Sequence, residues 1–287
     1  MFAIARLTFQ EASKKRIFLL TLLLSAVFLA LYGAALHLFA KEFAKIQSVP
    51  GSVQLIARQV MGQQLLGAGL YFSSFLLALL ALLASVGSIA SEIENGLLQA
   101  IVSKPMRRRE IVLGKFLGYG ILLTVYALLL YAGIMLLNGH YNHSALTALN
   151  TGSLLAGAAV FLLQPLLLLA VALLFSTLFR TLTAGIVSVM LYALSVIGGF
   201  LEQIGGLINR GDLINTGIAV SLIIPSDTLF RKLMNIVGGG DTNPLASLAA
   251  GPFGVTAPPS NLMLAYVGLY IVASLWLAIR VFDRKDL

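Results

Sequence analysis

The sequence predicts an all-α, polytopic membrane protein with about six transmembrane helices. Of its 287 residues, 59% are hydrophobic and only 10% are charged, whereas a soluble domain carries about 25% charged residues. Uncharged apolar runs of the roughly 20 residues that a bilayer crossing needs recur along the chain. This number of charges is too small to cover a water-facing surface. We therefore expect residues 1–287 to form a single transmembrane domain, with no room for a soluble ATPase, kinase or protease domain.

The charge and cysteine content exclude several other classes of protein. The net charge is +8, but the basic residues flank apolar runs, where lysine and arginine anchor and orient membrane helices. We therefore expect no nucleic-acid partner. The chain has no cysteine, which excludes disulfides, thiolate metal sites and cysteine nucleophiles.

Residues 1–16 are predicted to form an amphipathic helix on the inner membrane surface. Apolar or small residues recur near one helical face, and polar residues occupy the others. The first set is Phe2, Ala5, Phe9, Ala12 and Ser13, and the second is Arg6, Gln10 and Lys14. An unstructured basic tail is the alternative.

Six apolar segments are expected to cross the bilayer because each is long enough and almost free of charge. They are Ile17–Phe39, about Leu65–Ala90, Phe116–Leu137, about Leu154–Phe179, Ala184–Leu201 and Leu262–Val281. A helical, polar stretch from Lys41 to Gln64 is expected before the second span. A kink is expected at Gln164-Pro165, since neighbouring helices can satisfy the carbonyl that a proline frees.

Residues 202–261 form an external or re-entrant segment in this prediction. Leu213–Ile224 is apolar but too short to cross comfortably, and it could span, dip into the bilayer or cap the outside. After Pro225, Ser226 is a plausible N-cap of a further helix that Gly238 ends. One face of that helix holds Leu229, Phe230, Leu233, Met234 and Val237.

The distribution of lysine and arginine predicts the orientation. With six spans, 13 of these residues fall on one side and 6 on the other, which together make the 19 in the chain. The richer side faces the cytoplasm by the positive-inside rule. Both termini and the loop from Ser91 to Lys115 are therefore expected to be cytoplasmic.

That loop, residues 91–115, carries the most informative pattern. Two acids, Glu92 and Glu94, close the second span, and Gly96 permits a sharp turn. A short amphipathic stretch follows, ended by Pro105, and its apolar positions are Leu97, Leu98 and Ile101. An ordinary loop would account for the basic residues before the third span, but not for acids followed by an exposed apolar helix. The pattern indicates a docking element for a soluble partner.

The same loop resembles that of ABC-2 type permeases, the membrane subunits of ATP-binding-cassette transporters. Within this family it is most similar to the branch that includes the permease of nitrous-oxide reductase maturation. The basic surface helix before the first span and the ending Val281–Leu287 resemble the family as well. The residues that match in the loop are Glu92, Glu94, Gly96, Ser103, Pro105, Arg108, Gly114 and Lys115.

The resemblance implies an exporter of the prokaryotic plasma membrane. Two permease chains, identical or related, would pair, and each would bind a separate cytoplasmic ABC ATPase that holds ATP and Mg. The loop would act as a coupling helix: Glu92 and Glu94 would pair with basic residues of the partner or of the surface helix, and the apolar positions would fill its groove. Arg107 to Arg109 would lie against anionic lipid headgroups.

The chain is expected to contain neither an ATPase site nor a metal site. A phosphate-binding loop needs G-x-x-x-x-G-K-[S/T], but Gly114-Lys115 is followed by Phe116, and the glycines at 238–240 lack the lysine. His140 and His143 have no nearby carboxylate that would complete a metal site. We therefore expect no cofactor in this chain.

The predicted spans contain almost no ionisable residues, which argues against an ion-coupled carrier or proton pump. The scarcity of ionisable residues is compatible with a pathway for a lipid-like solute, or with transport driven by ATP hydrolysis in a partner. The polar residues within the spans are expected to form contacts between helices. They are Ser73, Ser74, Gln164, Ser188 and Ser195.

A different function remains open: a membrane scaffold or sensor subunit that anchors a soluble protein through the same loop without transport. An ATPase gene beside this one would favour the exporter.

Overall fold

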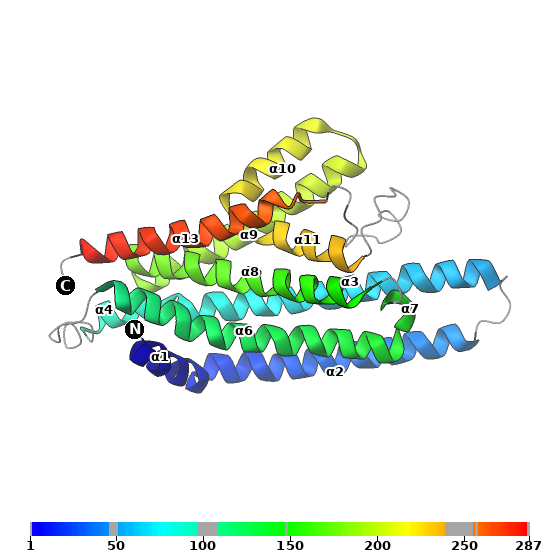
Figure 1. Cartoon of the computed structure of the whole chain (residues 1–287), viewed down its shortest axis with the longest axis horizontal. Helices are drawn as coiled ribbons and strands as arrows, with labels where there is room; N and C mark the ends of the chain where they lie inside the picture. Colours follow the sequence, from blue (N-terminus) through cyan, green and yellow to red (C-terminus); the bar gives the residue numbers. More distant parts are fainter. Residues whose placement is uncertain are drawn as a thin grey trace.

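The chain folds into an elongated bundle of helices in the computed structural model (Figure 1), which describes residues 2–45, 51–96, 108–146, 149–238, 255 and 258–285. Within these ranges every regular element is a helix, as predicted. The helices are α1 (Phe2–Lys14), α2 (Arg16–Lys45), α3 (Gly51–Ser85), α4 (Gly87–Glu94), α6 (Arg108–Tyr141), α7 (His143–Leu146), α8 (Thr151–Leu178), α9 (Thr181–Leu207), α10 (Gly211–Ile223), α11 (Ser226–Val237) and α13 (Leu262–Asp283).

Six helical stretches in the described part of the chain are long and apolar enough to cross a membrane, as the sequence predicted. They are Arg16–Phe43, Ala57–Glu94, Arg108–Tyr141, Thr151–Leu178, Thr181–Leu207 and Leu262–Asp283. Most are longer than predicted because the helices continue past the apolar runs into polar residues. The polar stretch before the second span is helical on both sides of residues 46–50, as expected.

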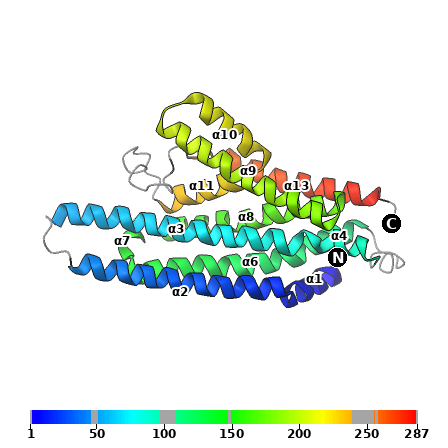
Figure 2. The ribbon, with the colours of Figure 1, turned by 180° about the vertical axis from the view of Figure 1, so that it is seen from behind.

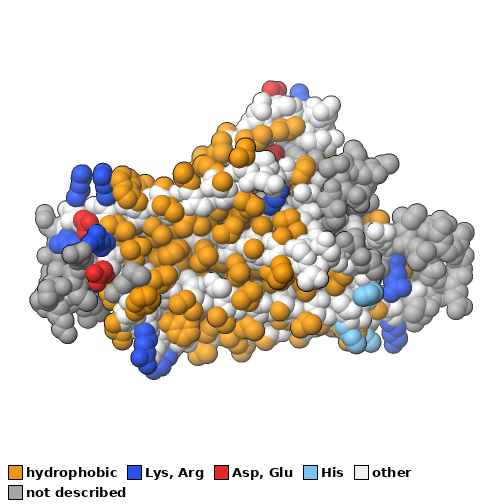
Figure 3. Space-filling model, in the orientation of Figure 1, with side chains coloured by type: hydrophobic (Ala, Val, Ile, Leu, Met, Phe, Trp, Pro, Cys, Tyr) orange, Lys and Arg blue, Asp and Glu red, His pale blue; other side chains and the backbone are white. Residues whose placement is uncertain are grey.

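Both chain termini, α4 and the start of α6 lie at one end of the bundle, which we call the terminal end (Figures 1 and 2). The opposite end, which holds α7, is called the far end. Figure 3 shows hydrophobic side chains over the middle of the bundle, with most Lys and Arg side chains nearer its ends. This is the pattern of a protein whose middle contacts lipid.

Helix α8 is the centre of the bundle and packs against α3, α4, α6, α9, α11 and α13. Its residues 167–173 are all buried, so a continuous apolar run faces protein on every side. The helix continues through the buried Pro165 without a break, and it begins at the N-cap Asn150, whose side chain accepts a hydrogen bond from Ser153 N.

The predicted N-terminal helix is present as α1, and one side of it packs on the bundle. Ala5 and Ala12 are buried together with Thr8, because α1 packs along α6, where a side chain at Gly118 would come within 2.6 Å of Ala5 O. Phe2 is 80% exposed. The small residues of the predicted apolar face thus contact protein, whereas Phe2 and Phe9 remain exposed.

The segment after the fifth span contains two helices, α10 and α11. α9 and α10 form a close hairpin that leans away from the bundle axis (Figure 2). Glycines allow the two helices to approach each other. A Cβ at Gly205 would lie within 2.8 Å of Ile214 N, and a Cβ at Gly217 within 2.7 Å of Glu202 N. α10 and α11 then meet at a bend of 110°. Such a pair is a broken span or a re-entrant loop, so Leu213–Ile224 does not continue into a straight crossing.

The backbone at this bend is held by side chains. Ser195 Oγ donates to Ile224 O at 2.8 Å and accepts from Asp227 N at 3.0 Å. Two tyrosines of α13 donate to the last carbonyls of α10, Tyr266 to Leu222 O and Tyr270 to Ile223 O. Irregular backbone at membrane depth needs such partners because lipid supplies none.

Helix α11 begins and ends close to the predicted positions. Its predicted apolar face is buried throughout, and Gly238 is the C-cap. The predicted N-cap was wrong: Ser226 is the first helical residue, the cap position is Pro225, and no side chain caps the helix. Ser226 Oγ instead accepts a hydrogen bond from Gln164 Nε2 at 3.5 Å.

Replacing Gly199 by alanine is expected to destabilise the protein by about 1–3 kcal/mol, the usual effect of overpacking a tight interior. A methyl group there would overlap the carboxylate of Asp227. Gly268→Ala is the matched control, since its added methyl would have no atom within 4 Å and alanine favours a helix over glycine by about 1 kcal/mol. Thermal unfolding in detergent would measure the stability of both variants, and equal unfolding midpoints would contradict the expectation.

Candidate functional site

The predicted coupling loop begins inside α4, which contains its residues 91–94. α4 is separated from α3 by Val86, and two N–H groups of its first turn, those of Ile89 and Ala90, donate to Ser176 Oγ of α8 at 3.1 and 2.9 Å. The helix ends at Glu94, and Gly96 has a φ of 68°. This left-handed conformation suits glycine because it has no Cβ. The turn predicted at Gly96 is confirmed.

Glu92 forms an ion pair with Lys115, another residue of the predicted motif. Lys115 Nζ lies 2.5 Å from Glu92 Oε1 and donates to Ser88 O at 2.5 Å. The Lys115 side chain is only 5% exposed and that of Glu92 is 19% exposed. The lysine therefore joins α4 to α6 across the two ends of the loop, because a buried ammonium requires a partner.

Glu94 joins the loop to α9. Its carboxylate accepts hydrogen bonds from Thr181 N at 3.0 Å and from Thr181 Oγ1 at 2.9 Å. Thr181 is the first residue of α9, and that helix has no cap from its own N-cap side chain. A carboxylate at this position satisfies a free N–H group and is favoured by the helix dipole.

Arg108 joins the other side of the loop to α13. One nitrogen of its guanidinium, Nη1, donates to Phe282 O at 3.1 Å, Asp283 O at 3.2 Å and Lys285 O at 2.6 Å. Arginine is favourable at a helix C-terminus because the last carbonyls have no partner within the helix. Lys285 Nζ in turn donates to Thr177 O of α8 at 2.9 Å. We call these contacts of Glu92, Glu94, Arg108 and Lys115 the terminal network.

The structure pairs two of the predicted site residues, Glu92 and Lys115, and joins two others, Glu94 and Arg108, to α9 and α13. Among the described residues, neither acid contacts a cation of the surface helix, one of the two kinds of partner expected: Glu92 pairs with Lys115, and Glu94 caps α9. Gly114 is buried within α6, which starts at Arg108, so Gly114 and Lys115 lie inside the helix and not at its entry. The other predicted site residues, Leu97, Leu98, Ile101 and Pro105, lie outside the described residues, as does Ser103.

A second polar site was missed by sequence reasoning. Arg231, which lies in the segment predicted to be external or re-entrant, is only 1% exposed. Its Nη2 donates to Glu202 Oε2 of α9 at 2.7 Å, and its Nε donates to Asp227 Oδ2 at 3.1 Å. Arg231 Nη1 has no hydrogen-bond partner among the described residues. We call Glu202, Asp227 and Arg231 the buried charge cluster.

Two buried ionisable residues lie inside helices that extend beyond the apolar segments predicted from the sequence. Glu202 lies inside α9, which continues to Leu207 instead of ending at Leu201, and Lys115 lies inside α6. Buried charges in a membrane protein are costly and mark functional or structural contacts. The i, i+4 spacing of Asp227 and Arg231 was the signal available in the sequence.

The uncharged polar residues of the spans form contacts between helices, with two exceptions. Gln164 of α8 accepts a hydrogen bond from Ser74 Oγ of α3, and Ser195 holds the bend described above. Ser188 instead donates to Ala184 O of its own helix at 2.7 Å. Ser73 Oγ has no partner in the described ranges.

The described residues contain no group of three or more His, Cys, Asp or Glu side chains that could hold a metal ion. His140 instead packs edge-on against Tyr141, with ring centroids 4.6 Å apart.

Six candidate spans in the described part of the chain define a multi-pass membrane protein. The chain belongs to the ABC-2 family of transporter proteins, whose family pattern matches residues 2–287. The family prediction made from the loop is confirmed.

Two relatives are similar over a short region. "Probable ABC transporter permease protein NosY" of Stutzerimonas stutzeri is 39% identical over 57 residues, which cover 20% of this chain and 21% of that protein. The protein of the same name from Pseudomonas aeruginosa has the same identity and coverage. The match thus spans about a fifth of these relatives, and it supports the branch predicted from the sequence.

Proposed function

We propose that this chain is the membrane subunit of an ATP-driven exporter in a prokaryotic plasma membrane. A separate cytoplasmic ATPase binds ATP and Mg and docks on residues 91–115. A second permease chain, identical or related, completes the pathway. The family supplies the class of protein, and the terminal network is the observation that supports coupling through this loop.

The network suits a lever because it ties the loop to helices on several sides of the bundle. A push on the loop reaches α6 through Lys115, α9 through Glu94 and α13 through Arg108. ATP-driven transport needs a bundle with two states whose balance a partner shifts by a few kcal/mol. A loop with bonds to three helices can transmit a movement of the ATPase to them, whereas a loop without such contacts transmits it only through its own ends.

The charge distribution supports a cytoplasmic terminal end. Lys14, Lys15, Arg16 and Arg180 all lie where spans begin or end at that side of the bundle. Lysine and arginine in short segments beside membrane helices favour the cytoplasmic side. The same orientation exposes the loop to a soluble ATPase.

Purification from native membranes in a mild detergent tests this proposal. We expect a soluble ATPase with a phosphate-binding loop to copurify in stoichiometric amount. Replacing Leu97 and Leu98 by serine should release it, because both residues are predicted to fill its groove. Replacing Leu136 by serine is the control, since this residue is 74% exposed in α6, away from the loop.

Retention of the ATPase by the Leu97 and Leu98 variant would remove the loop from the interface. A preparation without any ATPase would contradict the exporter and favour a scaffold.

A further inference from the structure

The buried charge cluster contains two acids and one base. The guanidinium of Arg231 donates to Glu202 through Nη2 and to Asp227 through Nε, so one positive charge faces two carboxyl groups. The three side chains are at most 11% exposed. If both acids were ionised, the cluster would hold one uncompensated negative charge, which is costly inside a membrane protein.

Among the described residues, no second cation acts on Asp227. The ammonium of Lys232, the residue after Arg231, donates to the exposed Asn261 side chain at 2.8 Å. Tyr71 of α3 and Tyr192 of α9 lie close enough to interact with the charge of Asp227, but tyrosine hydroxyls are neutral at about pH 7. The other polar side chains around the cluster are uncharged as well: Ser195 of α9, Ser221 of α10, Thr228 of α11 and, through Ser226, Gln164 of α8.

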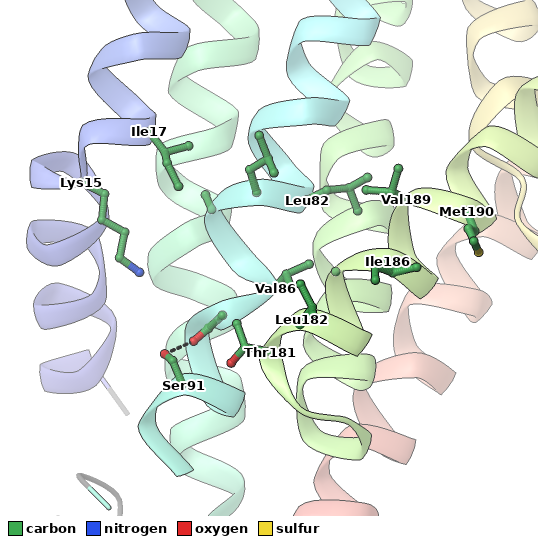
Figure 4. Close-up of a pocket in the computed structure, with 14 residues that line it drawn as sticks. Lys15, Ile17, Leu82, Val86, Ser91, Thr181, Leu182, Ile186, Val189 and Met190 are labelled. Atoms are coloured by element: carbon green, nitrogen blue, oxygen red, sulfur yellow. Dashed lines mark hydrogen bonds between the residues drawn. The ribbon is translucent and has the colours of Figure 1, made fainter. Parts of the chain in front are cut away.

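The carboxyl group of Asp227 lies against the backbone of α9, where a Cβ at Gly199 would overlap it. The apolar groove shown in Figure 4 lies elsewhere, beside the first turns of α9. About 18 Å of helix, at ~1.5 Å per residue, separates Met190, which lines that groove, from Glu202. A buried acid without a cation of its own becomes neutral by keeping its proton.

A second observation at the same site points to water. Arg231 is 1% exposed, yet its Nη1 has no hydrogen-bond partner among the described residues. This donor belongs to the same planar group whose Nη2 and Nε face the two acids. A buried N–H group requires an acceptor. Water is the smallest acceptor that could reach it, and water is also a base that can receive a proton.

We propose that the buried charge cluster is a proton-binding site: Asp227 holds a proton while α11 packs against α9, and releases it when this contact opens to water. On release, the O–H bond of the carboxyl group breaks, the proton passes to a water molecule, and water solvates the carboxylate. Glu202 is the ionic partner of Arg231 because its bond is the shorter one, 2.7 Å against 3.1 Å for Asp227. The proposal goes beyond the proposed function and does not rest on it.

Infrared spectroscopy of the full chain, in a detergent without ester groups, tests for the proton through the carbonyl band of a protonated carboxyl group. Carboxyl groups in water are ionised at about pH 7, so at this pH the band comes only from an acid that keeps its proton. We expect the band in the unaltered protein, and Asp227→Asn should remove it. Asp212→Asn is the matched control and should retain it, since Asp212 is exposed in the first turn of α10.

The dependence of stability on pH gives a second readout. A carboxyl group that is protonated in the fold and ionised in the unfolded chain makes the fold more stable at low pH. Stability should therefore fall as the pH rises from the ordinary carboxyl range, about pH 4, to the pH at which Asp227 ionises in the fold. In this range the folding equilibrium constant should fall by up to about ten-fold per pH unit more than that of Asp227→Asn. Unfolding by a denaturing detergent measures this constant, and Asp212→Asn should behave as the unaltered protein does.

Absence of the band from the unaltered protein at about pH 7 would overturn the proposal, whether or not the variants fold. A band that survives in Asp227→Asn but is lost in Glu202→Gln would reject Asp227 as the site of the proton. Equal pH dependence of stability in the unaltered protein and in Asp227→Asn would mean that Asp227 is ionised in the fold. Since no measurement uses the ATPase, failure of this test is separate from failure of the proposed function.

Discussion

Replacing Arg231 by methionine is expected to destabilise the protein by about 3–5 kcal/mol, the usual effect of removing one partner of a buried ion pair. Glu202 and Asp227 would both remain enclosed with side chains only 11% and 10% exposed, and no cation would compensate them. The loss should separate α11 from α9, because the Arg231–Glu202 bond is the charged contact between these helices. Thermal unfolding in detergent, followed by size-exclusion chromatography, would measure it.

Neutralising the acids as well should restore most of the lost stability. The triple variant Arg231→Met, Glu202→Gln, Asp227→Asn leaves no buried charge, and replacing a whole buried pair by neutral groups is often neutral or stabilising. Lys232→Met is the matched control: its ammonium donates to Pro259 O and to the exposed Asn261 side chain, so we expect a change within about 0.5 kcal/mol. A triple variant no more stable than Arg231→Met would show that the arginine acts through something other than charge.

The sequence predicted well those features that depend on local patterns. Apolar runs of sufficient length predicted all six candidate spans, because a bilayer imposes the same length on each of them. The apolar face of α11 and its end at Gly238 followed from helical spacing and from the tolerance of glycine at a helix end. These features need only residues a few positions apart.

The features that the sequence did not predict join residues far apart in the chain. Glu202 and Arg231 are 29 positions apart, and nothing local indicates that α10 folds back to bring α11 beside α9. The glycines at 198, 199, 205 and 217 contained the missing information, since close helix packing in membranes uses small residues. Gly198 and Gly199 lie at the end of the predicted fifth span, and Gly205 and Gly217 lie in the segment predicted to be external or re-entrant.

At the candidate site, too, local patterns could be predicted and contacts between distant residues could not. Similarity to the ABC-2 loop selected Glu92, Glu94, Arg108 and Lys115, and the structure gives each of them a contact with another helix at the terminal end. Their partners could not be predicted, because Thr181 and Phe282 lie 87 and 174 positions from the residues that contact them. The motif therefore selected residues that make contacts between helices, but it did not predict their partners.

Replacing Lys115 by methionine is expected to destabilise the terminal end by about 2–3 kcal/mol. This is less than the ~3–5 kcal/mol of a fully enclosed pair, because Glu92 is 19% exposed and water can reach it. Ser88 O would also lose its donor. Arg109→Gln removes a cation from the same helix at an exposed position and serves as the control, with an expected change within about 0.5 kcal/mol.

The double variant Glu92→Gln, Lys115→Met separates folding from coupling. It removes both charges, so its stability should exceed that of Lys115→Met alone. The exchange variant Glu92→Lys, Lys115→Glu should recover less stability than this double variant. A carboxylate at position 115 would face the carbonyl of Ser88 and could not donate a hydrogen bond to it.

Under the proposed function, the stable double variant should still be uncoupled. With its partner ATPase in vesicles, it should bind normally but no longer change the rate of ATP hydrolysis, because the ion pair that carries movement from α4 to α6 is gone. Arg109→Gln should behave as the unaltered protein does. A double variant that is folded and fully coupled would mean that movement enters through Glu94 and Arg108 alone, and that the Glu92–Lys115 pair serves stability only.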